Sequence, residues 1–441
     1  MKKKIWISLL LLLVLRVFVA YSLDLNFSTW WNIDCGNDVV RPPDLEKFLY
    51  WDTDEDLTQS GINARINPTT QVPKEMNTLR FFPDEAQKNC YSLPFINSQR
   101  YLIRAGFYYG NYDALSSPPT FDLYLDQKKW STINTSIIEG SIYHEAVYVT
   151  RASGFLSLCL VQTKEGDVPF ISSIEAVPLP SDLYFHLDTN YSFILVTRTN
   201  LGGDEVRYVD FTSDEKYNRI WTHGEIPSNC ISVPTLPDIS FTLENEPPNT
   251  VMSDSIQSRI ATNPIIMTVD LPPRTPYPQL AYFIFYFNEI AALPGNTRTI
   301  LIYSDGQMKS TVTTEFIKCK VVTIKAVTVA GPTINVTLGT TDGSTLPAII
   351  SAMEVFIRGE SYEVANGLVT DEGVDELSGN VPAVNEVSGV TREGRDAMGH
   401  NELSAGVASV HSLGCLGIDV VHLVSQRPHG GRQTVECKIY N

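Results

Sequence analysis

Short apolar segments rich in β-branched and aromatic residues recur along the chain, and clusters of turn-forming residues separate them. Ser116-Ser117-Pro118-Pro119, Leu271-Pro272-Pro273 and Ser304-Asp305-Gly306 are three such clusters. No long stretch before residue 360 shows a convincing apolar period of 3.6 residues, which argues against helices. We therefore expect an all-β protein built of sandwiches. The expected strands are Tyr101–Tyr109, Phe121–Leu125, Phe155–Val161, Tyr282–Phe287, Thr299–Tyr303, Val321–Val329 and Thr333–Leu338.

The order of these segments repeats with an offset of about 180 residues. Each half ends in an Ile-Ser-x-x-Glu motif before a last apolar strand, Ile171–Glu175 in the first half and Ile350–Glu354 in the second. Internal duplication of a sandwich explains this order, and two unrelated β segments are the alternative. We expect one lobe over residues 23–180, a linker over Pro178–Asp188 and a second lobe over residues 189–358.

Both ends of the chain differ from this pattern. Lys2, Lys3 and Lys4 precede an apolar run from Ile5 to Ala20 that only Arg16 interrupts, which predicts a signal peptide over residues 1–22. An uncleaved anchor helix is the alternative, although the uncharged part of the run is short for a bilayer. Residues 359–441 are rich in Gly, Val, Ser, Asp and Glu without a sustained period, so we expect a poorly ordered tail there.

Charge narrows the classes of partner. Fifty acidic residues against 33 basic ones give a net charge of −17, which argues against nucleic acid and against anionic membrane surfaces. Neutral glycans, basic peptides and other proteins remain compatible with this charge. Export is also indicated by glycosylation sequons at Asn26, Asn134, Asn190 and Asn335, the last on the outer face of an alternating strand. The seven cysteines permit disulfides, whose pairing cannot be deduced from the sequence.

A dozen short motifs resemble the plant malectin-like domain, in the family's order, over roughly residues 25–358. The chain is similar to the extracellular part of malectin-like, leucine-rich-repeat receptor kinases of plants. That resemblance implies two tandem malectin-like lobes, each a jelly-roll-type β-sandwich. The motifs are Ile33-Asp34-Cys35-Gly36, Leu79-Arg80-Phe81-Phe82-Pro83, Asn89-Cys90-Tyr91, Tyr101-Leu102-Ile103-Arg104-Ala105, Tyr109-Gly110-Asn111-Tyr112-Asp113, Phe121-Asp122-Leu123-Tyr124-Leu125, Cys159-Leu160-Val161, Pro169-Phe170-Ile171-Ser172, Tyr217-Asn218-Arg219-Ile220-Trp221, Pro247-Pro248, Val251-Met252 and Glu289-Ile290.

After residue 358 the sequence departs from the receptor-kinase pattern, because the remaining residues carry no leucine-rich repeat, membrane span or kinase motif. We expect the tail to reflect an alternative or mispredicted reading frame, with a genuine soluble receptor-like fragment as the other reading. The expected location is extracellular, on the cell-wall side. A natural transcript that continued, or an uncleaved N-terminal helix, would make the protein a single-pass plasma-membrane protein instead.

Catalysis has no candidate in the sequence. The acidic run Asp52–Asp56 lacks the Gly and the bidentate Glu of an EF-hand, so we expect a solvated loop. No Gly-x-Ser-x-Gly elbow, His-Glu-x-x-His or Cys-x-x-Cys motif is present, and no spacing selects a carboxylate pair. We therefore expect no enzyme, no metal and no cofactor. An enzyme acting on wall polysaccharide is the competing class.

One segment has the groups that a sugar site needs. Sugars stack on aromatic faces and donate to carboxylates. The resemblance to animal malectin, which stacks glucose on aromatics after the equivalent strand, implies Tyr109, Tyr112 and Asp113 as ligand contacts. The alternative is that these residues pack the sandwich and fix a turn. The expected function is recognition of a cell-wall carbohydrate, a secreted peptide or a partner protein. A truncated fragment that pairs with the ectodomain of a full-length receptor kinase is the alternative.

Overall fold

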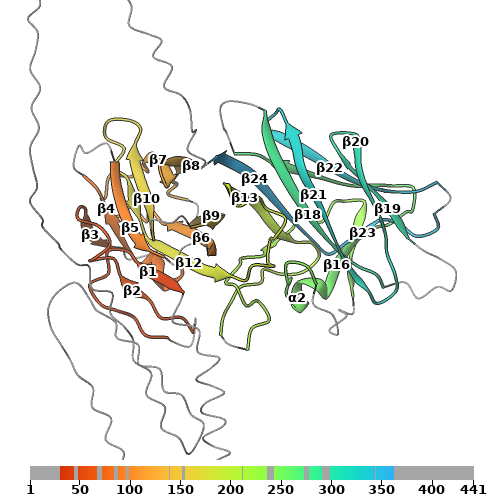
Figure 1. Cartoon of the computed structure of the whole chain (residues 1–441), viewed down its shortest axis with the longest axis horizontal. Helices are drawn as coiled ribbons and strands as arrows, with labels where there is room; N and C mark the ends of the chain where they lie inside the picture. The colour runs from red at the N-terminus through yellow and green to blue at the C-terminus, as the bar shows by residue number, and fades with distance from the viewer. Residues whose placement is uncertain are drawn as a thin grey trace, which may run out of the picture. The chain divides into compact units, whose positions relative to one another are not determined.

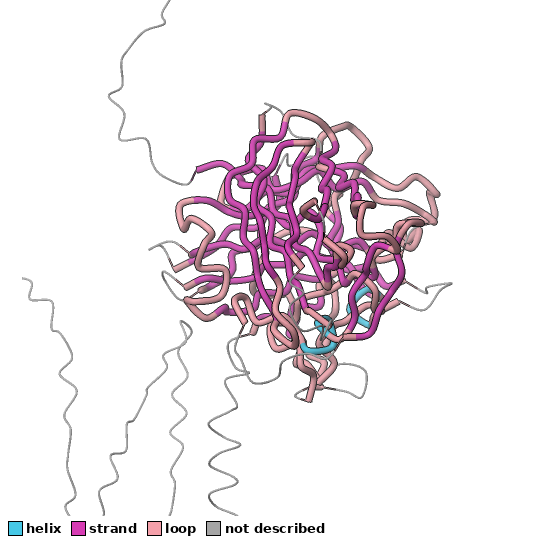
Figure 2. Tube along the Cα trace, turned by 90° about the vertical axis from the view of Figure 1, so that its right-hand side faces the viewer, coloured by secondary structure: helices cyan, strands magenta, loops and turns pink. Residues whose placement is uncertain are grey.

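The computed structural model describes residues 30–43, 48–66, 72–83, 88–95, 99–138, 140–150, 154–210, 212–235, 243–272, 278–290, 298–342 and 344–361. The expected signal peptide, Asn26 and nearly all of the expected tail lie outside these residues. The described part is almost wholly β, as expected, and its helices are the short segments Lys74–Met76 and α2 (Asn249–Met252) (Figure 2). None of the described helices is long and apolar enough to cross a membrane.

A ten-stranded sheet runs through both halves of the chain (Figure 1). In order across the sheet lie β2 (Asp52–Thr53), β1 (Trp31–Asp34), β12 (Ser173–Leu179), β6 (Arg100–Phe107), β9 (Ile142–Val149), β13 (Tyr191–Asn200), β24 (Ala352–Ser361), β18 (Gln279–Asn288) and β21 (Cys319–Val329), with β14 (Thr222–His223) beside β13. The halves meet where β9 pairs with β13, with Phe193 opposite Val147 and Ile194 opposite Ala146. The described residues therefore belong to one compact unit in which both halves of the chain share a sheet.

Two four-stranded sheets complete the two sandwiches. The first contains β5 (Lys88–Pro94), β10 (Phe155–Gln162), β7 (Thr120–Leu125) and β8 (Lys128–Asn134), and the second contains β17 (Ile265–Asp270), β22 (Thr333–Thr340), β19 (Thr299–Ser304) and β20 (Gln307–Thr313). Two three-stranded sheets contain β11 (Phe170–Ile171), β4 (Thr78–Phe81) and β3 (Ile62–Arg65), and β15 (Cys230–Pro234), β16 (Asp254–Ser258) and β23 (Ile349–Ile350). A disulfide joins Cys90 on β5 to Cys159 on β10, which face each other in register.

Strands β6, β12 and β18 of the shared sheet are buried on both faces. On β18, Phe283 and Phe285 point into the core of the second sandwich, whereas Ile284 and Tyr286 point into a third core on the opposite face. Strands covered on both faces read as continuous apolar runs, which explains why β6 and β18 stood out in the sequence. The third core is closed by segments that follow β12 and β13, including Leu183, Tyr184, Leu187, Trp221, Val251 and Met252.

A row of alternating charges crosses the shared sheet on the face of the third core. Arg104 on β6 binds Glu175 on β12 at 3.2 Å and Glu145 on β9 at 2.9 Å. Arg198 on β13 binds Glu145 and Glu354, on β24, at 2.7 Å each. All five side chains are at most 4% exposed. The glutamate of each Ile-Ser-x-x-Glu motif is thus a buried partner of an arginine, and we call this row the charge ladder.

Candidate functional site

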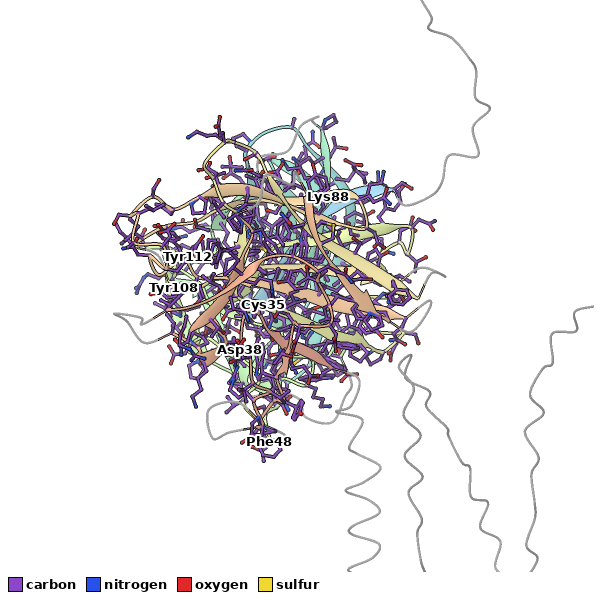
Figure 3. All side chains as sticks on the ribbon, turned by 90° about the vertical axis from the view of Figure 1, so that its left-hand side faces the viewer. Cys35, Asp38, Phe48, Lys88, Tyr108 and Tyr112 are labelled. Atoms are coloured by element: carbon purple, nitrogen blue, oxygen red, sulfur yellow. A yellow bond between two sulfur atoms is a disulfide. The ribbon has the colours of Figure 1, made fainter. Side chains whose placement is uncertain are left out.

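Tyr109, Tyr112 and Asp113 lie together in the loop that joins β6 to β7. The loop turns tightly because Gly110 and Asn111 adopt φ angles of 50° and 54°, in the left-handed region. A side chain could not replace the glycine, since a Cβ there would lie 2.5 Å from a methyl group of Ile66. Figure 3 shows the labelled Tyr108 and Tyr112 at the margin of the first sandwich.

The hydroxyl of Tyr109 organises this loop. It donates to Asp113 Oδ1 at 2.6 Å and accepts from the backbone N–H of Ser117 at 3.2 Å. The same carboxylate oxygen accepts the N–H of Leu115 at 3.0 Å. Burial, together with the hydrogen bond to Asp113, raises the pKa of Tyr109 to about 12. Because only 1% of Tyr109 is exposed, its ring packs the sandwich and offers no face to a ligand in this arrangement.

Tyr112 is partly exposed. Its ring centroid lies 5.1 Å from that of Phe81 and 5.6 Å from that of Phe170, so one part of the ring belongs to an aromatic cluster. Burial, and then the negative charge of Asp113, raise the pKa of Tyr112 above its usual value. The structure therefore brings the three residues together but assigns them different surroundings. Ligand contact by Tyr112 and Asp113 stays a prediction.

The predicted glycosylation sites differ in exposure. Asn134, at the end of β8, and Asn335, on β22, are exposed, and Asn335 lies on the outer face as its alternating strand predicted. Asn190 is half-buried just before β13, and its backbone N–H binds Asp188. Room for a glycan is therefore evident at two of the described acceptors.

The acidic run Asp52–Asp56 is only partly the solvated loop expected from the sequence, because Glu55 and Asp56 are exposed but Asp54 is not. Asp54 is fully buried, and both of its carboxylate oxygens accept from Arg80 at 2.7 Å. Tyr91 also donates to this carboxylate at 2.9 Å. The sequence could not show this because the partners lie 26 and 37 residues away.

Buried carboxylates elsewhere are also engaged with arginines. Glu145 and Glu175 share Arg104, and Glu289 binds Arg298 at 2.9 Å. These carboxylates therefore serve as counter-ions to buried guanidinium groups. Within the described ranges, no three His, Cys, Asp or Glu side chains are grouped as a metal site would require.

Comparison with known proteins decides the family. The model of the malectin-like domain matches residues 33–357. This chain belongs to the malectin-like domain family. The resemblance noted in the sequence is thereby confirmed, and with it the all-β, sandwich-type fold.

The relatives of this malectin-like chain include receptor kinases. The probable LRR receptor-like serine/threonine-protein kinase MEE39 of Arabidopsis thaliana is 29% identical over 366 residues, which cover 81% of this chain and 40% of that protein. The malectin-like chain thus spans well under half the length of this relative.

Solved ectodomains share the fold. The ANX2 ectodomain from Arabidopsis thaliana matches with a TM-score of 0.62 and 14% identity, over 76% of this chain and 97% of that one. A chain in the structure of the plant peptide RALF23 in complex with FER and LLG2 matches with a TM-score of 0.58 and 15% identity, over 75% and 95%. The described residues therefore have the architecture of a malectin-like ectodomain.

Proposed function

We propose that this chain is an extracellular, non-catalytic recognition module that binds a secreted peptide or a partner protein. The observation that carries the proposal is the architecture shared with ectodomains, one of which was solved in a complex with RALF23. The net charge of −17 adds to it, because an acidic surface attracts basic partners and steers their association. A secreted location follows from the N-terminal signal-peptide pattern. A receptor-kinase ectodomain is a further possible partner.

Binding assays on one platform test this function. The secreted chain, captured on a sensor surface, is titrated with a panel of synthetic secreted peptides of differing charge and with cell-wall oligosaccharides. Saturable binding of basic peptides, weakened by salt, is the expected result. Binding of oligosaccharides alone would overturn the peptide proposal. Turnover of a chromogenic wall oligosaccharide would overturn the non-catalytic role, and co-purification with a receptor-kinase ectodomain alone would favour the pairing alternative.

Carbohydrate binding at the Tyr112 loop is a second candidate. It is favoured by the partial exposure of Tyr112 and Asp113 on a loop that internal hydrogen bonds hold rigid. The test compares Tyr112→Ala with Ile260→Ala, an exposed apolar control in the second half, on arrayed wall oligosaccharides. Equal binding by both variants would reject this loop as a sugar site.

A further inference from the structure

An exposed apolar face lies at the edge of the shared sheet, where side chains alternate between two environments. Leu49 and Trp51 are 3% and 0% exposed and pack with Tyr208 in a small separate core. Phe48, which precedes Leu49, is 46% exposed, and Tyr50, which lies between Leu49 and Trp51, is 52% exposed. Positions that alternate in an extended segment share a face, so Phe48, Tyr50 and the half-exposed Asp52 point outward together.

Two neighbouring segments extend this face. Arg41 and Trp51 exchange backbone hydrogen bonds of 2.9 Å, a register that places the exposed Val40 beside Asp52. The N–H of Phe48 donates to the carbonyl of Val209 at 2.7 Å, and Val209 is exposed. We call the set Val40, Phe48, Tyr50, Asp52 and Val209 the apolar ridge. Figure 3 shows Phe48 projecting at the extremity of the molecule.

The apolar ridge contains residues from both halves of the chain, and a small hydrophobic core supports it from below. Val209 follows Tyr208, whose ring meets that of Trp30 edge-on at 5.1 Å between centroids. Tyr208 also packs with Leu49 and Trp51 in the small core below the ridge. A surface fixed in this way loses little conformational freedom on binding, which favours affinity. Clustered exposed apolar side chains are unusual on soluble proteins and mark interaction surfaces.

Three described carboxylates, those of Asp38, Asp52 and Asp210, belong to the ridge or adjoin it in the sequence. Asp52 has no cationic partner among the described residues, and burial raises its pKa because the carboxylate is partly desolvated without such a partner. Asp38, which precedes Val39 and Val40, is bound by the amide of Asn63, and Asp210, next to Val209, is bound by Thr212.

Two described arginines close to ridge residues in the sequence already pair with carboxylates. Arg41 binds Asp34 at 3.3 Å, and Arg207 binds Glu205. A partner that brought its own cations would therefore meet Asp52, which pairs with no arginine or lysine among the described residues.

We infer that the apolar ridge binds an extended segment of a secreted peptide in which apolar side chains alternate with Lys or Arg. The apolar side chains pack on Phe48, Tyr50 and Val209, and a cation pairs with Asp52 or lies over the ring of Tyr50. A second copy of the chain fits less well, because it brings the same net charge of −17 and the same Asp52 to the contact. This inference rests on the proposed function and names its binding surface.

The test uses the whole secreted chain and a fluorescein-labelled synthetic peptide of about 12 residues in which Arg alternates with Leu and Phe. A peptide with Glu in place of Arg is the charge control. Phe48→Ala combined with Tyr50→Ala should weaken binding of the basic peptide at least about tenfold, because exposed aromatic anchors dominate such contacts. Asp52→Asn should weaken it several-fold, with a smaller effect at about 0.5 M NaCl. Phe316→Ala, which truncates a side chain that is 48% exposed elsewhere, should leave binding unchanged.

The results of this test distinguish a failure of the apolar ridge from a failure of the proposed recognition function. Saturable binding that the ridge variants leave intact would overturn the ridge while the recognition function stands. No binding of any basic peptide by the wild-type chain would overturn both. Equal loss with Phe316→Ala would show non-specific adhesion and also overturn the ridge. A dimer in sedimentation velocity that Phe48→Ala and Tyr50→Ala abolish would assign the ridge to a second copy instead. If the double variant fails to fold, as judged by its thermal transition, Asp52→Asn decides.

Discussion

Arg198 Nη1 lies 2.7 Å from Glu145 Oε1, and these two buried residues come from different halves of the chain. Burial by itself lowers the pKa of Arg198, but Glu145 and Glu354 outweigh that effect and hold the pKa well above its usual value. The guanidinium is therefore permanently charged between two acids. Buried ions need such matched partners, so the charge ladder ties the position of one half of the chain to that of the other.

Replacing Glu145, which pairs with both Arg104 and Arg198, should lower the stability of the fold. Glu145→Gln leaves two buried arginines with one carboxylate fewer, so we expect the free energy of unfolding to fall by about 3–5 kcal/mol. Urea denaturation followed by tryptophan fluorescence measures it. Glu360→Gln is the matched control, because its pair with Lys128 is exposed and should contribute at most about 1 kcal/mol. Equal losses in the two variants would contradict a structural role of the ladder.

Acid should destabilise the fold through His144. Burial lowers the pKa of His144 from 6.5 to about 4, and its ring lies against Phe107. Between these values the unfolded chain binds a proton that the folded chain does not, so stability falls as the pH falls. The contribution is at most about 1.4 kcal/mol per pH unit. Unfolding at pH 7, 6 and 5 should show a shallower dependence of stability on pH for His144→Gln than for wild type. Identical slopes in the two proteins would be contrary to this expectation.

The disulfide should support the first sandwich. Cys90 and Cys159 are 69 residues apart, and closing a loop of that length restricts the unfolded chain. Replacing both by alanine should lower the free energy of unfolding by about 2–5 kcal/mol. Peptide mapping without reductant checks the bond itself and should recover the two cysteines in one linked fragment. Recovery of Cys90 linked to a different cysteine would refute the pairing.

Glycans should occupy the exposed acceptors. When the chain is expressed through a secretory pathway, Asn134→Gln and Asn335→Gln should each remove the mass of one glycan, because both side chains face solvent. Intact-mass spectrometry before and after enzymatic deglycosylation measures this. A mass loss equal to the amino-acid difference alone would show that the site is not used.

Local alternation explains why the strands could be predicted. Thr333–Leu338 alternates polar with apolar residues, and β22 occupies that segment and continues to Thr340. The expected strand Tyr101–Tyr109 was slightly too long, because β6 ends at Phe107 and its last two expected residues enter the tight loop. Strand existence therefore follows from periodicity, whereas strand ends depend on turn geometry.

Contacts between residues far apart in the sequence explain why some features could not be predicted from it. The burial of Asp54 depends on Arg80, and the pairing of β9 with β13 joins separate repeats, so neither leaves a local pattern. The ridge was missed for another reason. Residues 48–51 are all apolar, and nothing in that run tells which two face the solvent. Tyr109 was proposed as a ligand contact on an aromatic-rich motif, which a buried ring that fixes a turn also produces.

The pairing of β9 with β13 also bears on whether the two halves of the chain can be separated. Suppose that the chain is cut between Leu179 and Tyr191 and the two pieces are separated. Strands β9 and β13 would then each lose a hydrogen-bonded neighbour in the sheet. Unpaired strand edges recruit other chains, so isolated pieces would aggregate or reassociate.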